Sequence, residues 1–304
     1  EPDTKRVVGS VGTIPVYIFF DGKKILTSQA CDVVIIPEFQ KRGLFYKLHE
    51  MTTQDGVDRG IQLMYGFSVP TTLKISVKLL KFKNVFPIRR LVRVLEPTHF
   101  IERKIKFPVC IAKIAGRILG RIQRLMHPEI VRLPSGYCLK EVSLFDERYD
   151  RFMETIADKA KIMIYKDSKY LNWRYINCPS LRNKWKIFSL EKDGVVYGFV
   201  VVVIQDEDIR RAYILELLVA PGKESLAEVL LSQAIRYCYD SKADSINSWS
   251  RENSLIWNVE RKKGFVVKET MHNLIVRPHF KKEATLDITE PDCWDINMGD
   301  SDYV

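Results

Sequence analysis

The 304-residue sequence lacks the patterns that indicate a metal site, a disulfide framework or a membrane-spanning helix. Its six cysteines lie far apart without a Cys-x-x-Cys pair, and its five histidines never recur at His-x-x-x-His spacing, so no zinc site is expected. Such cysteines are typical of reduced, buried thiols in a cytoplasmic protein. No uncharged apolar run approaches the ~20 residues of a spanning helix, and the first residues form no secretion signal.

The sequence does have a globular composition and enough length for two domains. Hydrophobic residues make up 46% of the chain and charged residues 28%, which excludes a disordered chain. A chain of 304 residues allows two domains of ordinary size, each with its own core.

The most informative local pattern is a strand, a short basic turn and a helix over residues 33–51. An apolar run ends at Pro37, and after Gly43 apolar residues recur at helical spacing. The first N–H groups of such a helix have no partner within it, and the helix dipole adds partial positive charge, so this turn suits a diphosphate. Gly43 lets a ligand approach the backbone closely, and Lys41 and Arg42 add charge at the rim.

A second strand is expected over 60–67 and a second helix over 71–82. In this order of elements the chain resembles the GNAT superfamily of acyl-CoA-dependent N-acyltransferases. The signature of that superfamily is a strand, a Gln/Arg-x-x-Gly-x-Gly/Ala loop, a helix and a second strand that splays from the first. Gln40 and Gly43 match it, whereas Phe45 stands where the family has a small residue. The resemblance implies a mixed-sheet α/β fold that takes acetyl-CoA or another acyl-CoA as donor substrate, without a metal. The cofactor-binding residues that it implies are Ile35, Ile36, Gln40, Lys41, Arg42, Gly43, Leu44 and Phe45.

Two landmarks of the sequence recur at a nearly constant offset. The run 32–37 is echoed 184 residues later by 216–221, and Lys81-Phe82 is echoed 183 residues later by Gly264-Phe265. We therefore expect two tandem GNAT-like modules. The expected organisation is a first, acyl-CoA-binding module over 1–96, a basic linker helix region over 97–137 and a second, acceptor-shaping module over 138–304. The first module would be missing its usual N-terminal strand and helices ahead of Glu1.

The second copy has the clearer pattern. Asp193-Gly194 between apolar runs predicts a tight hairpin. After Pro221, the loop 222–226 has no Gln/Arg-x-x-Gly, so this copy is not expected to bind the acyl-CoA pyrophosphate in the usual way. Helices are expected over 146–165, 224–239 and 253–263, and strands over 185–190, 195–204, 212–219, 245–250 and 265–276.

Positive charge gathers between Lys74 and Arg124, where 14 Lys and Arg against two Glu give +12, compared with +10 for the whole chain. The pattern is typical of a linker helix that packs its isoleucines on a domain. The alternatives are weak contact with an anionic membrane surface, which would make a cytoplasmic protein peripheral to it, or with RNA. The basic residues at helical spacing are Lys113, Arg117, Arg121 and Arg124, beside an apolar stripe of Ile114, Ile118, Ile122 and Leu125.

The chemistry that the resemblance implies is direct attack of an amine on a thioester. It needs a base for the amine, donors for the oxyanion and an acid for the thiolate. The superfamily often uses a strand carboxylate as the base, which makes Asp32 and its repeat counterpart Glu216 the catalytic candidates. In some tandem members the C-terminal carboxylate, here that of Val304, is the base. The usual tyrosine acid is absent from 71–81, and its substitutes are Tyr65, Ser68 and Ser76.

Our interpretation is therefore an N-acyltransferase, by expectation an acetyltransferase, that acts on an amine the sequence does not identify. Two other functions fit the same residues: a degenerate GNAT-like binding module that contacts RNA or membrane, and a tRNA-dependent aminoacyl transferase on the same doubled fold. The loop 40–43 favours CoA over tRNA, whereas the missing tyrosine favours the binding module.

Overall fold

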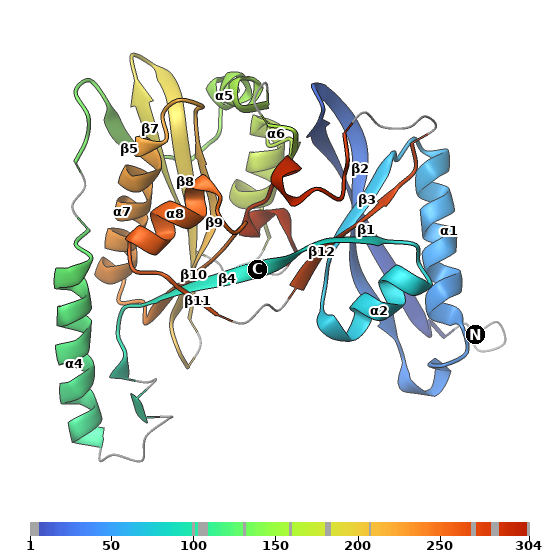
Figure 1. Ribbon diagram of the computed structural model, residues 1–304, viewed down its shortest axis with the longest axis horizontal. Coiled ribbons are helices and arrows are strands. Elements are labelled where there is room, and N and C mark those ends of the chain that lie inside the picture. Colours follow the sequence, from blue (N-terminus) through green and yellow to red (C-terminus); the bar gives the residue numbers. More distant parts are fainter. Residues whose placement is uncertain are drawn as a thin grey trace.

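The computed structural model describes residues 6–98, 101–102, 109–129, 132–157, 160–179, 184–206, 208–268, 272–280 and 286–302. Within these ranges the strands form one mixed sheet with helices on its faces and edges (Figure 1). The order of strands in the sheet is β13-β6-β1-β2-β3-β12-β4-β10-β9-β8-β7-β5, with β11 paired to β4. None of the described helices is both long and apolar enough to cross a membrane.

The first half of the chain follows the predicted order of a strand, loop, helix, strand and helix. A hairpin leads into the loop, and the two strands that flank the helix are parallel neighbours. The elements are β1 (Gly9–Phe20), β2 (Lys23–Ile35), α1 (Leu44–Asp58), β3 (Leu63–Ser68), α2 (Pro70–Lys78) and β4 (Lys83–Val94).

The second half contains the same succession of strands and helices, preceded by further elements. Strand β8 (Val195–Gln205), β9 (Arg211–Val219), α7 (Ser225–Asp240), β10 (Ser245–Ser250) and α8 (Leu255–Lys262) follow one another as β1, β2, α1, β3 and α2 do. The other elements are α4 (Val109–Met126), β5 (Cys138–Glu141), α5 (Glu147–Ala157), β6 (Ile162–Ile164), α6 (Ser168–Leu171), β7 (Lys184–Lys192), β11 (Val266–Val267), β12 (His272–Pro278) and β13 (Trp294–Asp295).

Two strands cross between the halves. Strand β4 pairs with β12 through residues 83–88 and with β10 through residues 89–94, so it belongs to both parts of the sheet. Strand β12 lies between β3 and β4. Residues from the end of the chain thus complete the first part of the sheet, and β4 extends the second. The domain boundaries at 96 and 138 stay a prediction.

The structure differs from the sequence prediction at two places. The helix expected over 146–165 ends at Ala157, and residues 162–164 form a strand that pairs with Ile18–Phe20 of β1. These three residues are fully buried, and their contact with β1 is long-range, so local spacing does not reveal it. The strand expected over 265–276 is split into β11 and β12. The hairpin turn at Asp193-Gly194 is confirmed, with φ of 50° and 77°.

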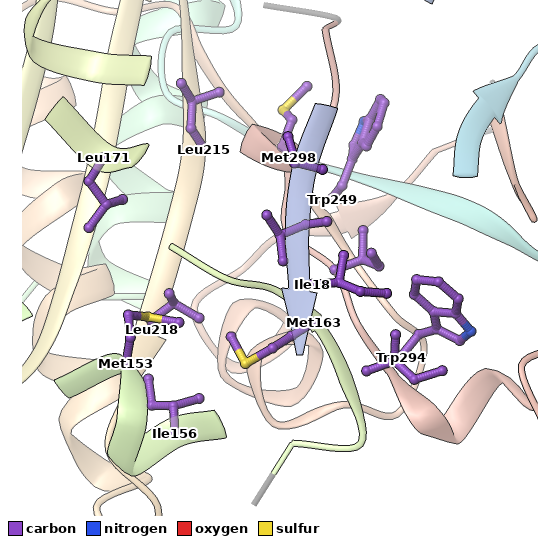
Figure 2. Packing of buried hydrophobic residues seen from close by; sticks show 14 of the residues in the cluster. Ile18, Met153, Ile156, Met163, Leu171, Leu215, Leu218, Trp249, Trp294 and Met298 are labelled. Carbon is purple, nitrogen blue, oxygen red and sulfur yellow. The ribbon is translucent and has the colours of Figure 1, made fainter. Parts of the chain in front are cut away.

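One buried cluster joins the two halves. Figure 2 shows Ile18 of β1 and Met163 of β6 in the same cluster as Leu218 of β9. Trp294 of the C-terminal segment is 2% exposed, and its indole N–H donates to the Ile288 carbonyl at 2.9 Å. Because the apolar surfaces of both halves are buried against each other, the core fixes how the halves sit relative to one another.

Candidate functional site

A cavity of about 220 Å³ opens where β2 and β3 separate. The two strands pair from Thr27 opposite Leu63 to Ala30 opposite Gly66, and the cavity begins at this last pair. Helix α1, α2 and the C-terminal segment close its sides. The lining residues are Ala30, Cys31, Asp32, Val33, Phe45, His49, Gly66, Phe67, Ser68, Val69, Thr72, Ser76, Leu80, Phe82, Ile275 and Asp302.

The β2 wall of this cavity carries a β-bulge. Gly12 pairs with Cys31 and Ser10 pairs with Val34, so Asp32 and Val33 together face the single intervening residue of β1. Asp32 has a positive φ of 44°. A bulge interrupts the hydrogen-bond ladder and re-aims side chains. The structure therefore places the predicted base Asp32 on the cavity, next to backbone groups released from regular pairing. In the described part of the chain, no side chain pairs with its carboxylate.

The N-terminus of α1 is open at the rim of the same cavity. Gly43 is its N-cap residue with a φ of 75°, and no described side chain caps the helix. A Cβ at Gly43 would have no atom within 4 Å apart from those of the adjoining residues, so a side chain at this position would enter open space. The first N–H groups of α1 are therefore available to an anion.

The loop before α1 is braced by its own contacts. Gln40 donates from Nε2 to the Ile35 carbonyl at 3.0 Å, and the Ile36 N–H donates to the Val8 carbonyl at 3.1 Å. Lys41 and Arg42 are exposed beside the helix terminus. Of the eight predicted cofactor-binding residues, Phe45 lines the cavity, and the others follow the end of β2, the loop and the start of α1: Ile35, Ile36, Gln40, Lys41, Arg42, Gly43 and Leu44.

Helix α1 also contributes a histidine that sequence reasoning missed. His49 is 4% exposed, lines the cavity and makes an edge contact of 4.8 Å with the ring of Phe45. Burial, and then the positive charge of Arg277, lower the pKa of His49, so the imidazole is neutral. Its Nδ1 is buried, without a hydrogen-bond partner among the described residues. The only sequence signal for His49 was its spacing of four residues from Phe45, which places both side chains on the same face of the helix.

Cys31 lies in the cavity wall as a thiol. It is 9% exposed, and burial, followed by the charges of Asp302 and Asp32, raises its pKa to about 11. A thiol with such a pKa is protonated at neutral pH, and the thiolate is the nucleophilic form. Cys31 is therefore held in its less nucleophilic form.

A second carboxylate reaches the cavity from the end of the chain. The side chain of Asp302 accepts a hydrogen bond at 3.0 Å from Nε2 of Gln29, which lies on β2 and is 4% exposed. The C-terminal segment that carries Asp302 runs between the two halves of the molecule (Figure 1). Sequence reasoning missed this position. Val304, the other predicted base, lies outside the described residues.

The structure separates the three candidate acids. Ser68 and Ser76 both line the cavity, and the Ser68 hydroxyl lies 3.0 Å from the hydroxyl of Thr72. Tyr65 is fully buried and does not line the cavity, and its hydroxyl has no hydrogen-bond partner in the part of the chain that the structure describes. Burial raises the pKa of Tyr65 well above its ordinary value. Of the three predicted acids, the two serines are therefore the ones that lie at the cavity.

Glu216, the other predicted catalytic residue, lies in the second half and does not line the cavity. It is 0% exposed, and both of its oxygens are engaged: Oε2 accepts from Lys166 Nζ at 2.6 Å and Oε1 accepts from Tyr175 at 2.6 Å. Burial raises the pKa of Glu216 to about 7. Lys166 also forms an ion pair of 2.8 Å with Asp300. Glu216 is therefore part of a buried polar cluster, which consists of Glu216, Lys166, Tyr175 and Asp300.

This cluster holds the C-terminal segment against β9. A Cβ at Gly299 would lie 2.6 Å from Glu216 Oε1, so only glycine allows the segment to come this close. Asn297 and Asp300 form a capping box around the turn Met298–Asp300. The segment therefore lies beside β9 and β10, and its residues 292–297 line a cavity of about 320 Å³ at the ends of these two strands.

An acidic side chain stands directly ahead of the helix in the second half. Glu224 accepts a hydrogen bond at 2.8 Å from the Gly222 N–H, directly ahead of α7. Hydrogen bonds from the backbone N–H groups of Glu224 and Gly222 lower the pKa of this carboxyl. A carboxylate at this position repels a phosphate. The structure thus supports the expectation that only the first half offers a pyrophosphate site.

We expect Lys166→Met to lower the free energy of unfolding by about 3–5 kcal/mol, because it leaves the buried carboxylates of Glu216 and Asp300 without their cation. The matched control is Lys24→Met, whose ion pair with Asp167 is exposed, and which should cost about 0–1 kcal/mol. Chemical denaturation measures both. Equal effects of the two substitutions would show that the buried cluster does not anchor the C-terminal segment.

Across the described ranges, no group of three or more His, Cys, Asp and Glu side chains could hold a metal ion.

No family model matches the sequence, and neither does any curated protein. Solved structures do match. Saccharomyces cerevisiae N-myristoyltransferase with bound myristoyl-CoA aligns over 90% of this chain and 64% of its own, with a TM-score of 0.62 and 14% identity.

Two bacterial structures align as well. A GCN5-related N-acetyltransferase from Anabaena variabilis aligns over 91% of this chain and 61% of its own, with a TM-score of 0.60 and 10% identity. The one from Kribbella flavida aligns over 90% and 57%, with a TM-score of 0.55 and 14% identity. The chain has the GNAT fold. The predicted fold class, a mixed α/β sheet with two GNAT-like modules, is confirmed. This GNAT-fold chain spans about three fifths of the length of these three structures.

Proposed function

We propose that the protein is an N-acyltransferase that moves an acyl group from acyl-CoA to an amine by direct attack. The observation that carries this proposal is the difference between its two halves. The first has a cavity beside a helix terminus without an acidic side chain, whereas the second has the carboxylate of Glu224 ahead of its helix and a cavity of about 320 Å³ that is partly bounded by the chain's own C-terminal segment. One donor therefore binds to each chain, in the first half.

In this proposal, the first half has a binding surface for each part of the acyl-CoA: the pyrophosphate, the pantetheine arm and the acyl group. The pyrophosphate binds the free N–H groups of α1, with Lys41 and Arg42 at the rim. The edge of β2 beyond Ala30 is free of β3 and offers backbone groups to the amides of the pantetheine arm. The acyl group then lies among the apolar side chains of Phe45, Leu80 and Phe82. The cavity of about 220 Å³ lies below the ~300–1,000 Å³ of ordinary ligand pockets, which favours a short acyl group such as acetyl.

The reacting groups then have named positions. The amine nitrogen bonds to the thioester carbonyl carbon, the carbon–sulfur bond breaks, and the ammonium proton passes to Asp32. Backbone N–H groups at the bulge of β2 stabilise the oxyanion. Ser68, which is paired with Thr72 at the cavity, donates a hydrogen bond to the departing thiolate, and the thiolate takes up the second proton of the attacking nitrogen to leave as the thiol of CoA. Asp302 attracts and orients a cationic acceptor, because its carboxylate is fixed by Gln29 at the cavity.

The test is release of CoA from acetyl-CoA in the presence of a panel of amines, with the acylated product identified by mass spectrometry. The panel contains spermidine, lysine and peptides with a free N-terminus. We expect CoA release that depends on the amine and matches the amount of acylated amine. If acetyl-CoA binds but none of the amines is acylated, the chain is a binding module, as one sequence interpretation held.

A further inference from the structure

Helix α4 presents an apolar face to solvent. Four of its apolar side chains are spaced so that they lie along one line of the helix, and two more lie beside them. Exposed apolar patches of this kind on a folded protein mark interaction sites. The six side chains and their exposures are Ile114 at 61%, Ile118 at 53%, Leu119 at 51%, Ile122 at 46%, Leu125 at 82% and Met126 at 69%.

The opposite face of α4 is fixed to the protein. A Cβ at Gly116 would lie 2.2 Å from the Thr98 hydroxyl, and one at Gly120 would lie 3.1 Å from the Leu95 carbonyl. The two glycines thus let the helix backbone lie directly on the segment after β4. The isoleucines expected to pack on a domain point outward instead, which corrects the linker interpretation of the sequence.

The C-terminal end of α4 is clamped by a buried arginine. Arg93 of β4 is 0% exposed and donates to the His127 carbonyl at 3.0 Å and to Glu129 at 3.0 Å. Glu129 also accepts from Arg124 at 3.1 Å. The helix therefore cannot turn its apolar face inward without breaking this cluster. In Figure 1, α4 stands at the outer edge of the molecule.

Basic side chains lie along one side of the apolar face. Arg117, Arg121 and Arg124 line a groove of about 460 Å³ that also contains Lys242. Two acidic residues of the groove are engaged elsewhere, since Glu96 accepts from Thr98 and Asp244 accepts from the Arg210 N–H. Within the described residues, no acidic side chain pairs with Arg117 or Arg121. The side chain of Lys113, the fourth predicted basic residue, lies outside the described residues.

We propose that α4 docks the protein on an anionic lipid bilayer, with the apolar face in the acyl-chain boundary and the arginine groove on lipid phosphates. An interfacial helix needs this combination of an apolar face and a flanking basic face. RNA would neutralise the arginines but leave six apolar side chains in water. A second copy would cover the apolar face, but residues 109–126 contain no Asp or Glu, so pairing two α4 helices brings their cations together without a partner.

The test is co-sedimentation of the whole chain with vesicles of phosphatidylcholine containing about one third phosphatidylglycerol, compared with pure phosphatidylcholine. We expect binding to the anionic vesicles only, weakening as salt rises. Ile118→Gln with Ile122→Gln should lower the partition coefficient roughly 100-fold, because two apolar side chains no longer leave water. Arg117→Gln with Arg121→Gln should lower it roughly 30-fold.

The matched controls change exposed residues elsewhere. Arg59→Gln with Arg236→Gln removes the same charge, from side chains that are 74% and 62% exposed. Leu144→Gln with Val195→Gln removes apolar groups that are 61% and 52% exposed. Both controls should partition like the parent, and circular dichroism checks that each variant is folded.

Three results would overturn the proposal: no binding of the parent to anionic vesicles, binding that the isoleucine substitutions leave unchanged, or binding that the control substitutions reduce equally. Salt-sensitive binding of a single-stranded RNA oligonucleotide without vesicle binding would assign the basic groove to RNA. A dimer that the isoleucine substitutions dissociate, again without vesicle binding, would assign the apolar face to a second copy.

Discussion

Gly43→Glu is expected to weaken acetyl-CoA binding by more than about 100-fold, since placing like charges together costs several kcal/mol. The position is the N-cap of α1, and a side chain there projects into the space in front of the free N–H groups. The new carboxylate would occupy the place of the pyrophosphate and repel it. Isothermal titration calorimetry of the folded variant measures the loss.

The second half supplies a matched control for this experiment. Gly222 has the same φ of 75° and equally open space around its missing Cβ, so Gly222→Glu imposes a comparable backbone strain. It lies ahead of α7, where Glu224 already closes the site to anions. We expect Gly222→Glu to bind acetyl-CoA like the parent. Equal losses in the two variants would mean that backbone strain, not the pyrophosphate site, is responsible.

Asp32→Asn is expected to lower kcat by roughly 10²–10⁴-fold, the usual contribution of a general base, while the Kd for acetyl-CoA changes little. The residue sits on the bulge of β2 at the cavity, and its carboxylate is unpaired within the described residues, so the substitution removes a proton acceptor without uncovering a buried partner. Steady-state kinetics with acetyl-CoA and the preferred amine measure kcat and KM separately.

Asp302→Asn tests the second carboxylate in the same assay. Its oxygen is held by Gln29, which suits binding of a cationic amine, so we expect a raised KM for the amine with a smaller change in kcat. A large loss of kcat in Asp302→Asn, together with an unchanged kcat in Asp32→Asn, would mean that Asp302 is the general base and that Asp32 is not. Normal kinetics in both variants would place the reaction elsewhere in the molecule.

Features that depend on local chemistry were predictable from the sequence. The prediction of the loop before α1 rests on one proline, one glycine and the helical spacing that follows, and in the structure α1 begins directly after that glycine. The hairpin at Asp193-Gly194 follows from the need for positive φ at both turn positions. Asp32 reaches the cavity because it lies a fixed number of residues before the loop, on the strand that forms one wall.

Features that depend on long-range packing were not predictable in this way. Glu216 matches Asp32 in sequence, but its surroundings come from Lys166 and from the C-terminal segment, which local patterns do not place. Asp302 reaches the cavity only because that segment passes between the halves. The spacing of the apolar stripe in α4 is typical of a buried face. The structure buries the other face instead, because its glycines let the helix backbone lie against the segment after β4.

Stoichiometry of acetyl-CoA binding tests the central claim most directly, because the account assigns one open site to a chain with two similar halves. Calorimetric titration of the unmodified protein should give one acetyl-CoA per chain, displaced by free CoA. Two acetyl-CoA per chain would show that the second half is also open to the donor, and no binding at all would contradict the proposed function.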